Sequence, residues 1–320
     1  MRACIYRRFG GPDVLEWVED WPAPTCGPGQ LRARIAAVSV NPKDALLRAG
    51  RFRFRFPIDR RRLPRGTPLD GAGTIIAVGS QVQSVAVGDA VFGMTNRFTG
   101  GVLATDAVFN ADEMARRPAG LGREEAAAPP LAGLTALQAL RNICQLQPGQ
   151  RVLVIGASGG VGHFAVQIAG LLEATVDATA SAVHHEWIKS LGAARVFDHH
   201  ALPVGDMPGT YDAVFDVSGR YGSADLARQL GWRGVFVSTV PSAGRLMAEL
   251  AARIGVRRSP RLVIVRSNRA DLACIGGWAE EGRLKPSIHN VFSAGEIVAA
   301  HRQIQTSHTA GKSVIYPCDA

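Results

Sequence analysis

Hydrophobic and polar positions follow one pattern through the first 110 residues of the chain. Short apolar runs rich in β-forming residues alternate with turns that contain glycine and proline, and the runs include 31–40 (LRARIAAVSV), 70–80 (DGAGTIIAVGS) and 89–94 (DAVFGM). Runs of this length, bounded by turn residues, are typical of β-strands. This part of the chain is therefore predicted to form a β domain.

From about residue 124 the pattern changes to helices that alternate with strands. Residues 124–143 have helical composition, and apolar runs typical of strands follow at 151–156, 174–180, 194–198, 211–219, 233–240 and 261–266. Helical stretches lie between most of them, at 162–172, 184–191 and 223–230, and a last helix is expected over 268–281. Strands linked by crossover helices form a parallel sheet. A doubly wound α/β fold is therefore predicted here.

Two further runs, 283–292 and 311–317, are β-like and resemble the first part of the chain. We therefore expect the chain to return to its first domain, which would comprise 1–123 and 283–320, with a second domain over 124–282. The length of 320 residues and the hydrophobic content of 47% are sufficient for two domains with separate cores.

A glycine-rich loop joins the first strand of the α/β part to the helix that follows. Its residues are Gly156, Ala157, Ser158, Gly159, Gly160, Val161 and Gly162. Glycines permit a tight turn and a close approach of the backbone to a pyrophosphate, and the helix N-terminus offers N–H groups and partial positive charge. These residues are predicted to bind a dinucleotide. The uncharged stretch 152–172 is long enough to cross a bilayer, but its five glycines favour a strand, a turn and a helix over a membrane span.

The end of the second strand of such a sheet selects the cofactor, because an NAD site places an acid there to bind the ribose 2′-OH. The acid of this strand, Asp177, stands near the strand's start, while Ser181 follows its tip and His184, His185 and Lys189 come soon after. A small hydroxyl near cations suits a 2′-phosphate, so NADPH is favoured over NADH. The alternative is that the histidines and Lys189 only cover a helix face.

The net charge of +9 is concentrated in one segment. Residues 48–65 hold eight arginines and one acid, whereas the remaining residues carry 28 basic and 26 acidic groups. The chain is therefore not basic over its whole surface, as many nucleic-acid-binding proteins are, and nucleic acid is not expected as a partner. Five scattered cysteines indicate neither a disulfide scaffold nor a CxxC zinc site, and residues 1–11 contain no apolar signal segment, so a reducing cytoplasm is expected.

Several motifs, in the same order, resemble the quinone oxidoreductase (zeta-crystallin-like) branch of the medium-chain dehydrogenase/reductase superfamily. They are Asn41-Pro42-Lys43-Asp44, Asp70-Gly71-Ala72-Gly73, 124–140 (EEAAAPPLAGLTALQAL), 146–162 (LQPGQRVLVIGASGGVG), 186–198 (EWIKSLGAARVFD) and 311–315 (GKSVI). The resemblance covers nearly the whole chain. It implies a GroES-like β domain split by the chain, a Rossmann domain, an active site between them, and a homodimer joined through the last Rossmann strand, 261–266.

Zinc alcohol dehydrogenases are relatives whose metal ligands this chain does not have at the matching positions. Asn41 stands where they have an early cysteine ligand, and Pro68-Leu69-Asp70 stand where they have a Gly-His-Glu element. The clusters Asp198-His199-His200 and His184-His185-Glu186 contain ligand types, but neither has HExxH spacing, and surface histidines are the favoured interpretation. No metal is expected.

Without a metal, the substrate must already be electrophilic, so hydride would go to a quinone or to the β-carbon of an α,β-unsaturated carbonyl. The resemblance implies that Asn41 and Asp44 lie near the nicotinamide and the substrate and that Thr135 faces the nicotinamide ring. Each has a structural alternative, because Asn41-Pro42 forms turns, Asp44 could cap a helix, and Thr135 could bond to its own helical turn.

Two departures from the family leave other functions open. Ala45-Leu46-Leu47 stand where many members have a tyrosine as a possible proton donor, and the run 51–56 (RFRFRF) alternates arginine with phenylalanine. Extended, the run would place arginines on one face and aromatic rings on the other. The alternatives are therefore an enoyl-thioester (acyl-CoA) reductase, or a non-catalytic NADPH-binding protein that binds RNA or a partner through Arg48–Arg65.

Overall fold

The computed structural model describes residues 1–51, 63, 65–97, 99–222, 224–240, 261–306 and 310–317. Contacts divide the chain into two compact units: the first is Met1–Leu131, Arg266–Gly282 and Pro286–Ala320, and the second is Ala132–Val265 and Arg283–Lys285. This division differs from the predicted domain boundaries at residues 124–131, 266–282 and 283–285.

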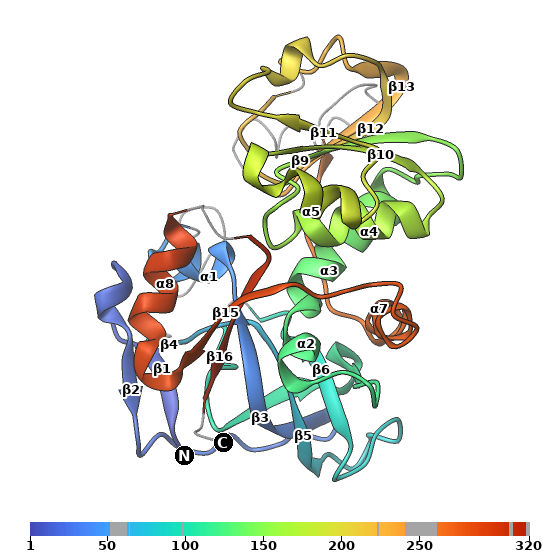
Figure 1. Ribbon diagram of the computed structural model, residues 1–320. Coiled ribbons are helices and arrows are strands. Elements are labelled where there is room, and N and C mark those ends of the chain that lie inside the picture. The colour runs from blue at the N-terminus through green and yellow to red at the C-terminus, as the bar shows by residue number, and fades with distance from the viewer. Residues whose placement is uncertain are drawn as a thin grey trace. The chain divides into compact units, whose positions relative to one another are not determined.

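The strands of the first unit pair antiparallel, except for the parallel pair Ile288–Ser293 and Lys312–Tyr316 (Figure 1). Its strands are β1 (Ala3–Tyr6), β2 (Glu16–Val18), β3 (Gln30–Val40), β4 (Arg65–Gly66), β5 (Asp70–Val78), β6 (Ala90–Met94), β7 (Asp106–Asn110), β8 (Met114–Arg116), β15 (Ile288–Ser293) and β16 (Lys312–Tyr316). Among the described residues they form a small sheet, β2-β1-β4, and a larger one, β15-β16-β3-β5-β6-β8, with β7 paired to β3. Because β16 pairs with β3, the end of the chain completes a sheet that begins near its start.

The long strand β3 shows why the sequence folds in this way. Leu31, Ala33 and Ile35 are buried, while Arg32 and Arg34 between them face away from the core. This alternation matches the two-residue period of a strand with one buried face. The helices of this unit are α1 (Pro42–Arg48), α2 (Arg123–Ala127), α7 (Arg269–Glu280) and α8 (Ile297–Gln305).

Helix α7, which the sequence placed in the second domain, is tied to the first unit. Its N-cap residue Asn268 accepts a hydrogen bond from the backbone N–H of Asp271 at 2.9 Å. Just before the helix, the Ser267 hydroxyl donates to the Glu113 carbonyl at 2.8 Å, and the Arg269 side chain donates to the Met114 carbonyl at 3.3 Å. These bonds to β8 and its preceding turn explain why the contact boundary falls earlier than the predicted one.

The second unit is a parallel sheet in the order β11-β10-β9-β12-β13-β14 among the described residues. Its elements are α3 (Pro129–Leu137, which crosses the unit boundary), β9 (Arg151–Ile155), α4 (Gly162–Leu171), β10 (Thr175–Ala180), α5 (His185–Ser190), β11 (Arg195–Asp198), β12 (Tyr211–Asp216), β13 (Leu230–Ser238) and β14 (Arg261–Leu262). All its strand pairs are parallel, and the order reverses beside β9. The predicted doubly wound sheet is confirmed.

Two predicted elements differ from the structure. The predicted helix over 223–230 is wrong, because residues 224–229 form turns and β13 already begins at Leu230. The Tyr211 N–H donates to the Gln229 carbonyl at 2.7 Å, so pairing with β12 overrides the local helical preference. The predicted strand over 261–266 is shortened to Arg261–Leu262, since the chain enters the first unit at Arg266.

Asp177, an acid within a parallel strand, is explained by its partners. Its carboxylate accepts hydrogen bonds from Arg195 at 2.6 Å, from Arg151 at 2.9 Å and from the Tyr211 hydroxyl at 2.9 Å. Burial alone would raise its pKa, but the hydrogen bonds from Arg195 and Tyr211 and the charge of Arg195 outweigh burial and lower the pKa. Asp177 is therefore an ionised, structural carboxylate.

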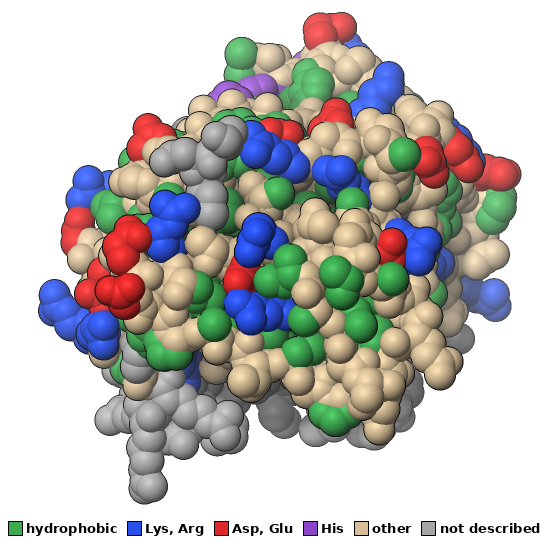
Figure 2. All heavy atoms as spheres, turned by 90° about the horizontal axis from the view of Figure 1, so that it is seen from below, with side chains coloured by type: hydrophobic (Ala, Val, Ile, Leu, Met, Phe, Trp, Pro, Cys, Tyr) green, Lys and Arg blue, Asp and Glu red, His purple; other side chains and the backbone are tan. Residues whose placement is uncertain are grey.

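Arg48 and Arg65, the two ends of the segment through which the alternative function would bind RNA or a partner, are buried. Arg48 is fully buried and donates to the Gly10 carbonyl at 2.6 Å. The RFRFRF run lies outside the described residues apart from Arg51, which is exposed. On the face shown in Figure 2, basic and acidic side chains are interspersed.

The uncharged stretch 152–172 forms most of β9, the glycine loop and the whole of α4. Among the helices that the structure describes, none combines the length and the apolar character that crossing a membrane requires.

Candidate active site

Asn41 stands where β3 ends and α1 begins. It is the N-cap of α1 in an extended conformation, Pro42 occupies the first helical turn, and the Asn41 backbone N–H donates to Asp44 Oδ2 at 2.8 Å. Asp44 is not the N-cap itself, but it takes part in capping as the N3 residue of a capping box, because its carboxylate accepts the N–H of the N-cap residue Asn41. This hydrogen bond within the motif thus holds the Asp44 carboxylate next to the Asn41 backbone.

Asn41 also joins a buried network that spans three strands. Its amide Nδ2 donates to Asp70 Oδ1 at 2.8 Å, and the Lys312 ammonium donates to Asn41 Oδ1. Asp70 Oδ2 accepts from the Ser39 hydroxyl at 2.8 Å and from the Leu131 N–H at 3.0 Å. The sheet brings these groups together, because Ser39 pairs with Asp70 across β3 and β5 and β16 lies on the other side of β3.

The network fixes which way the Asn41 amide points. An oxygen must face the ammonium and an NH₂ group must face the carboxylate, so only one orientation satisfies both Lys312 and Asp70. The Asn41 residue is 2% exposed, so water cannot replace these partners. Asn41 is thus held in a single geometry at the end of β3.

Two carboxyl groups in this network disfavour each other's ionisation. Burial, and then the charge of Asp70, raise the pKa of Asp44 to about 7, although Asn41 and Lys312 act in the opposite direction. Burial also raises the pKa of Asp70 and lowers that of Lys312. Asp44 Oδ1 has no hydrogen-bond partner within the described part of the chain. Asp44 can therefore hold a proton near neutral pH.

Sequence reasoning named Asn41 and Asp44 but missed Asp70 and Lys312 as members of their site. Both residues lie in quoted motifs, Asp70 in DGAG and Lys312 in GKSVI, so the signal was an ionisable residue at the start of an apolar strand run. A buried charge in such a position requires partners. The sequence alone could not show that the partners are each other.

The predicted dinucleotide loop, 156–162, lies between β9 and α4. Gly156 has φ of +82°, and a Cβ at Gly162 would lie 2.1 Å from the Gly156 carbonyl oxygen, so neither position tolerates a side chain. The Gly156 N–H donates to Thr179 Oγ1 at 3.0 Å, and the Ala157 N–H donates to the Thr179 carbonyl at 2.9 Å. Thr179, which sequence reasoning did not name, ties the loop to β10.

This loop fits the pyrophosphate of a dinucleotide. The first N–H groups of an α-helix have no partner within the helix, and α4 begins at Gly162, the last residue of the loop. Backbone without side chains at Gly159, Gly160 and Gly162 lets phosphate oxygens approach those N–H groups. The carboxyl edge of the sheet is where such ligands bind in this kind of fold.

The residues predicted to select the cofactor lie just beyond β10. Ser181 is the N-cap of a short turn before α5, and His185 Nε2 donates to the Ala180 carbonyl at 3.2 Å. Lys189 pairs with Glu186 at 2.8 Å on the surface. The fold therefore brings Ser181 and His185 together at the strand tip, while Lys189 already has a carboxylate partner.

Thr135 lies in α3 and is buried. It belongs to the same unit as the glycine loop, whereas Asn41 and Asp44 belong to the first unit. The predicted site residues thus form two groups, each assembled within its own unit.

A zinc ion does not fit the residues around Asn41. The Lys312 ammonium already contacts Asn41 Oδ1, and both oxygens of Asp70 accept hydrogen bonds from neighbouring groups. A zinc site of this kind needs deprotonated Cys, His or carboxylate ligands with free lone pairs. The Lys312 ammonium thus occupies the position at Asn41 where a zinc ion would need free ligand atoms.

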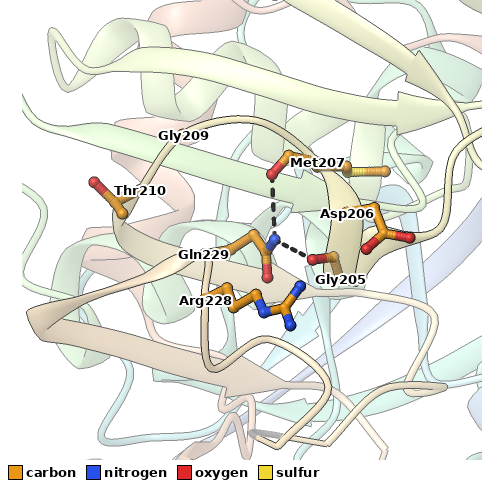
Figure 3. Close-up of a pocket in the computed structure, with 7 residues that line it drawn as sticks. All are labelled: Gly205, Asp206, Met207, Gly209, Thr210, Arg228 and Gln229. Carbon is orange, nitrogen blue, oxygen red and sulfur yellow. Dashed lines mark hydrogen bonds between the residues drawn. The ribbon is translucent and has the colours of Figure 1, made fainter.

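A cavity of about 400 Å³ opens elsewhere in the second unit (Figure 3). The loop 205–210 and the pair Arg228–Gln229 line it, and the Gln229 amide donates to the Gly205 carbonyl at 2.6 Å and to that of Met207 at 3.2 Å. These segments precede β12 and β13, so the cavity lies at the amino edge of the parallel strands. The glycine loop is at the opposite, carboxyl edge, and the cavity is not part of the candidate site.

Comparisons with known proteins agree with this geometry. Residues 27–122 match the alcohol dehydrogenase GroES-like domain, and residues 191–315 match the zinc-binding dehydrogenase domain. The chain is 32% identical to a chloroplast envelope quinone oxidoreductase homolog of Arabidopsis thaliana over 99% of this chain and 98% of that protein. It is 29% identical to an NADPH-dependent alkenal/one oxidoreductase of the same plant, over 99% of this chain and 80% of that one.

A solved structure extends the likeness to the fold. The quinone oxidoreductase from Coxiella burnetii matches with a TM-score of 0.89 and 30% identity, over 99% of each chain. The expected combination of a GroES-like domain and a Rossmann-type parallel sheet is thereby confirmed.

Proposed function

Because this chain belongs to the quinone oxidoreductase branch of the medium-chain dehydrogenase/reductase superfamily, we propose that it reduces quinones or α,β-unsaturated carbonyls with NADPH and without zinc. The observation that carries the proposal is the ammonium of Lys312 on Asn41, in the network where a zinc enzyme would need metal ligands. Without a Lewis acid there, the substrate must be an electrophile already, and quinones and enones meet that condition.

The second unit supplies the cofactor site in this proposal. The glycine loop and the start of α4 would hold the pyrophosphate, and Ser181 and His185 would face the 2′-phosphate; Lys189 would have to leave Glu186 to join them. When bound, NADPH supplies the hydride. An alkenal/one reductase similar to this chain is named as NADPH-dependent, which supports the same cofactor here.

The first unit orients the polar groups that meet the substrate. Lys312 and Asp70 hold the Asn41 amide in one orientation. Asn41 is thus pre-organised before any ligand arrives, which lowers the cost of orienting it during the reaction. Thr135, by its family position, would contact the nicotinamide ring.

Asp44 is the proposed source of the proton that completes reduction of an enone. It holds this proton on Oδ1, because Oδ2 already accepts the Asn41 N–H. A carboxyl group with a pKa of about 7 is well matched to proton transfer at neutral pH. This role would replace the tyrosine that many family members carry and that Ala45-Leu46-Leu47 lack here.

Steady-state oxidation of NADPH and NADH tests the proposal, with an ortho-quinone, an alkenal and crotonyl-CoA as separate acceptors. We expect turnover with the quinone or the alkenal, a preference for NADPH, and full activity after treatment with a zinc chelator. Turnover of crotonyl-CoA alone would support the thioester reductase instead. Tight NADPH binding without turnover of any acceptor would contradict an enzymatic role.

Ser181→Asp tests the cofactor site separately. The added carboxylate would repel a 2′-phosphate and could bind a ribose 2′-OH, so NADPH affinity should fall about tenfold while NADH affinity is retained. Cofactor fluorescence titration measures both affinities. Ser190→Asp, which adds the same charge at an exposed position of α5, should change neither. Equal losses for the two cofactors would show that Ser181 is not beside the 2′-phosphate.

We further propose a cytoplasmic homodimer joined along β14. Among the described residues this strand is the last in the sheet order, and Ile264 after it is a large exposed hydrophobic residue, as is Trp232 in the neighbouring β13. Exposed edges with apolar side chains favour pairing with a second copy. Light scattering should give twice the chain mass, and Ile264→Lys should shift the protein toward monomer.

A further inference from the structure

Three consecutive residues, Asp198, His199 and His200, carry metal-ligating atoms that lie close together. One ligand atom from each lies within 4.8 Å of the other two. Neighbours in an extended strand would point to opposite faces, but β11 ends at Asp198 and the two histidines follow in a turn. The turn therefore brings both imidazoles to one side, with ring centroids 4.2 Å apart.

Hydrogen bonds to Asp198 hold this turn in place. The His200 N–H donates to Asp198 Oδ1 at 2.9 Å, and the Leu202 N–H donates to the Asp198 carbonyl at 2.9 Å. On either side of the cluster, Phe197 and Leu202 pack against the hydrophobic core of the second unit. The backbone that carries the three ligands is thus anchored, and Asp198 Oδ2 is left for a cation.

The second histidine cluster of the sequence has no such arrangement. His185 Nε2 is engaged with the Ala180 carbonyl, and Glu186 is paired with Lys189. The structure thus separates two clusters that looked alike in sequence, and only the one after β11 brings its ligand atoms together among the described residues.

We propose that Asp198, His199 and His200 bind one divalent transition-metal ion, such as Zn²⁺ or Ni²⁺. Two imidazole nitrogens and one carboxylate oxygen suit these ions, whereas Mg²⁺ and Ca²⁺ prefer all-oxygen sites. Ligands about 2.0 Å from a tetrahedral ion lie about 3.3 Å apart, so modest side-chain rotation of the exposed His200 closes the site. Water completes the coordination.

This inference revises the sequence-based expectation of no metal. That expectation rested on ligand spacing, which HExxH motifs require on a helix, and a turn needs no such spacing. The site is separate from the Asn41 network, since it lies in the second unit. Asp198 pairs with Ala180 across β10 and β11, beside the residues proposed to hold the 2′-phosphate, so metal binding is measured without cofactor.

Isothermal titration calorimetry of the tag-free, chelator-treated chain with ZnCl₂ or NiCl₂ tests the proposal. We expect one saturable site per chain for each ion and no comparable signal with MgCl₂. His199→Gln combined with His200→Gln should weaken binding at least about tenfold. His289→Gln, an exposed histidine in the first unit, is the matched control and should leave the affinity unchanged.

Histidine ring NMR signals give a second readout that identifies the residues. Ni²⁺ should broaden two ring resonances, those lost in the His199→Gln and His200→Gln single variants, before any other. Absence of saturable binding, or binding that the double variant retains, would overturn the proposal. Broadening of other histidines first would overturn it as well.

Discussion

The two units each bury carboxylates, but they do so in opposite electrostatic settings. In the second unit, Asp177 accepts hydrogen bonds from two arginines and a tyrosine, and its pKa is lowered. In the first unit, Asp44 and Asp70 lie together near Lys312, and the pKa of Asp44 rises to about 7. Burial is common to both, so burial does not distinguish them.

The difference lies in how many cationic donors each carboxylate receives. The donors around Asp177 outweigh the effect of its burial, so its carboxylate stays ionised and carries no proton near neutral pH. This is expected of a structural ion cluster. Asp44 has an oxygen without a partner among the described residues and a second carboxyl group nearby. Perturbed groups of the second kind are typical of reactive sites.

Among the changes that test this comparison, Lys312→Met is expected to lower the free energy of unfolding most. The variant removes the ammonium that contacts Asn41 and interacts with both buried carboxyl groups, while Lys43 remains as a second nearby ammonium. The loss should be about 3–5 kcal/mol of unfolding free energy. Urea unfolding at pH 7 measures the loss. Combining Lys312→Met with Asp70→Asn should recover part of it, because one of the uncompensated charges is removed with the ammonium. A loss below about 1 kcal/mol would contradict charge coupling in the network.

Asp177→Asn should have a smaller effect on stability. The amide keeps one acceptor but loses the charge-assisted bonds, so a loss of about 2 kcal/mol is expected. Solvent limits the loss, since the Arg151 and Arg195 side chains are 38% and 44% exposed. The same unfolding assay applies. A loss as large as that of Lys312→Met would remove the contrast between the two regions.

A third test concerns the pH dependence of the stability that Asp44 contributes. Its folded pKa of about 7 lies above the unfolded value, so the folded state binds more protons between about pH 4 and 7. Its contribution to stability therefore falls as pH rises through that window. From pH 5 to pH 8, Asp44→Asn should gain about 2.5 kcal/mol in unfolding free energy relative to the original chain. A constant difference across this range would show that Asp44 is ionised throughout.

Much of the fold could be predicted from local pattern. The parallel strands, the glycine loop and the late β runs follow from apolar periodicity and turn residues, which act over a few neighbours. The segment 223–230 was misassigned because its pairing with Tyr211 is a tertiary contact. The short β14 depends likewise on where the chain leaves the sheet.

The candidate site was predictable only in part. Asn41 and Asp44 stand in one motif, whereas Lys312 reaches Asn41 from 271 residues away. Asp177 had no explanation in the sequence because its partners Arg151 and Tyr211 come from other strands of the sheet, β9 and β12. The sequence did not show that Asp198, His199 and His200 bring their ligand atoms together, because this depends on the turn that follows β11.

The most direct test of the account compares kcat/KM for NADPH-dependent reduction of an alkenal in Asp44→Asn and Asp177→Asn. Both are measured at pH 7 and 25 °C, after circular dichroism shows that each variant is folded. The account predicts that Asp44→Asn loses about a hundredfold, as removal of a proton donor does, while Asp177→Asn stays within about twofold of the original chain. Equal losses, or an unimpaired Asp44→Asn, would contradict it.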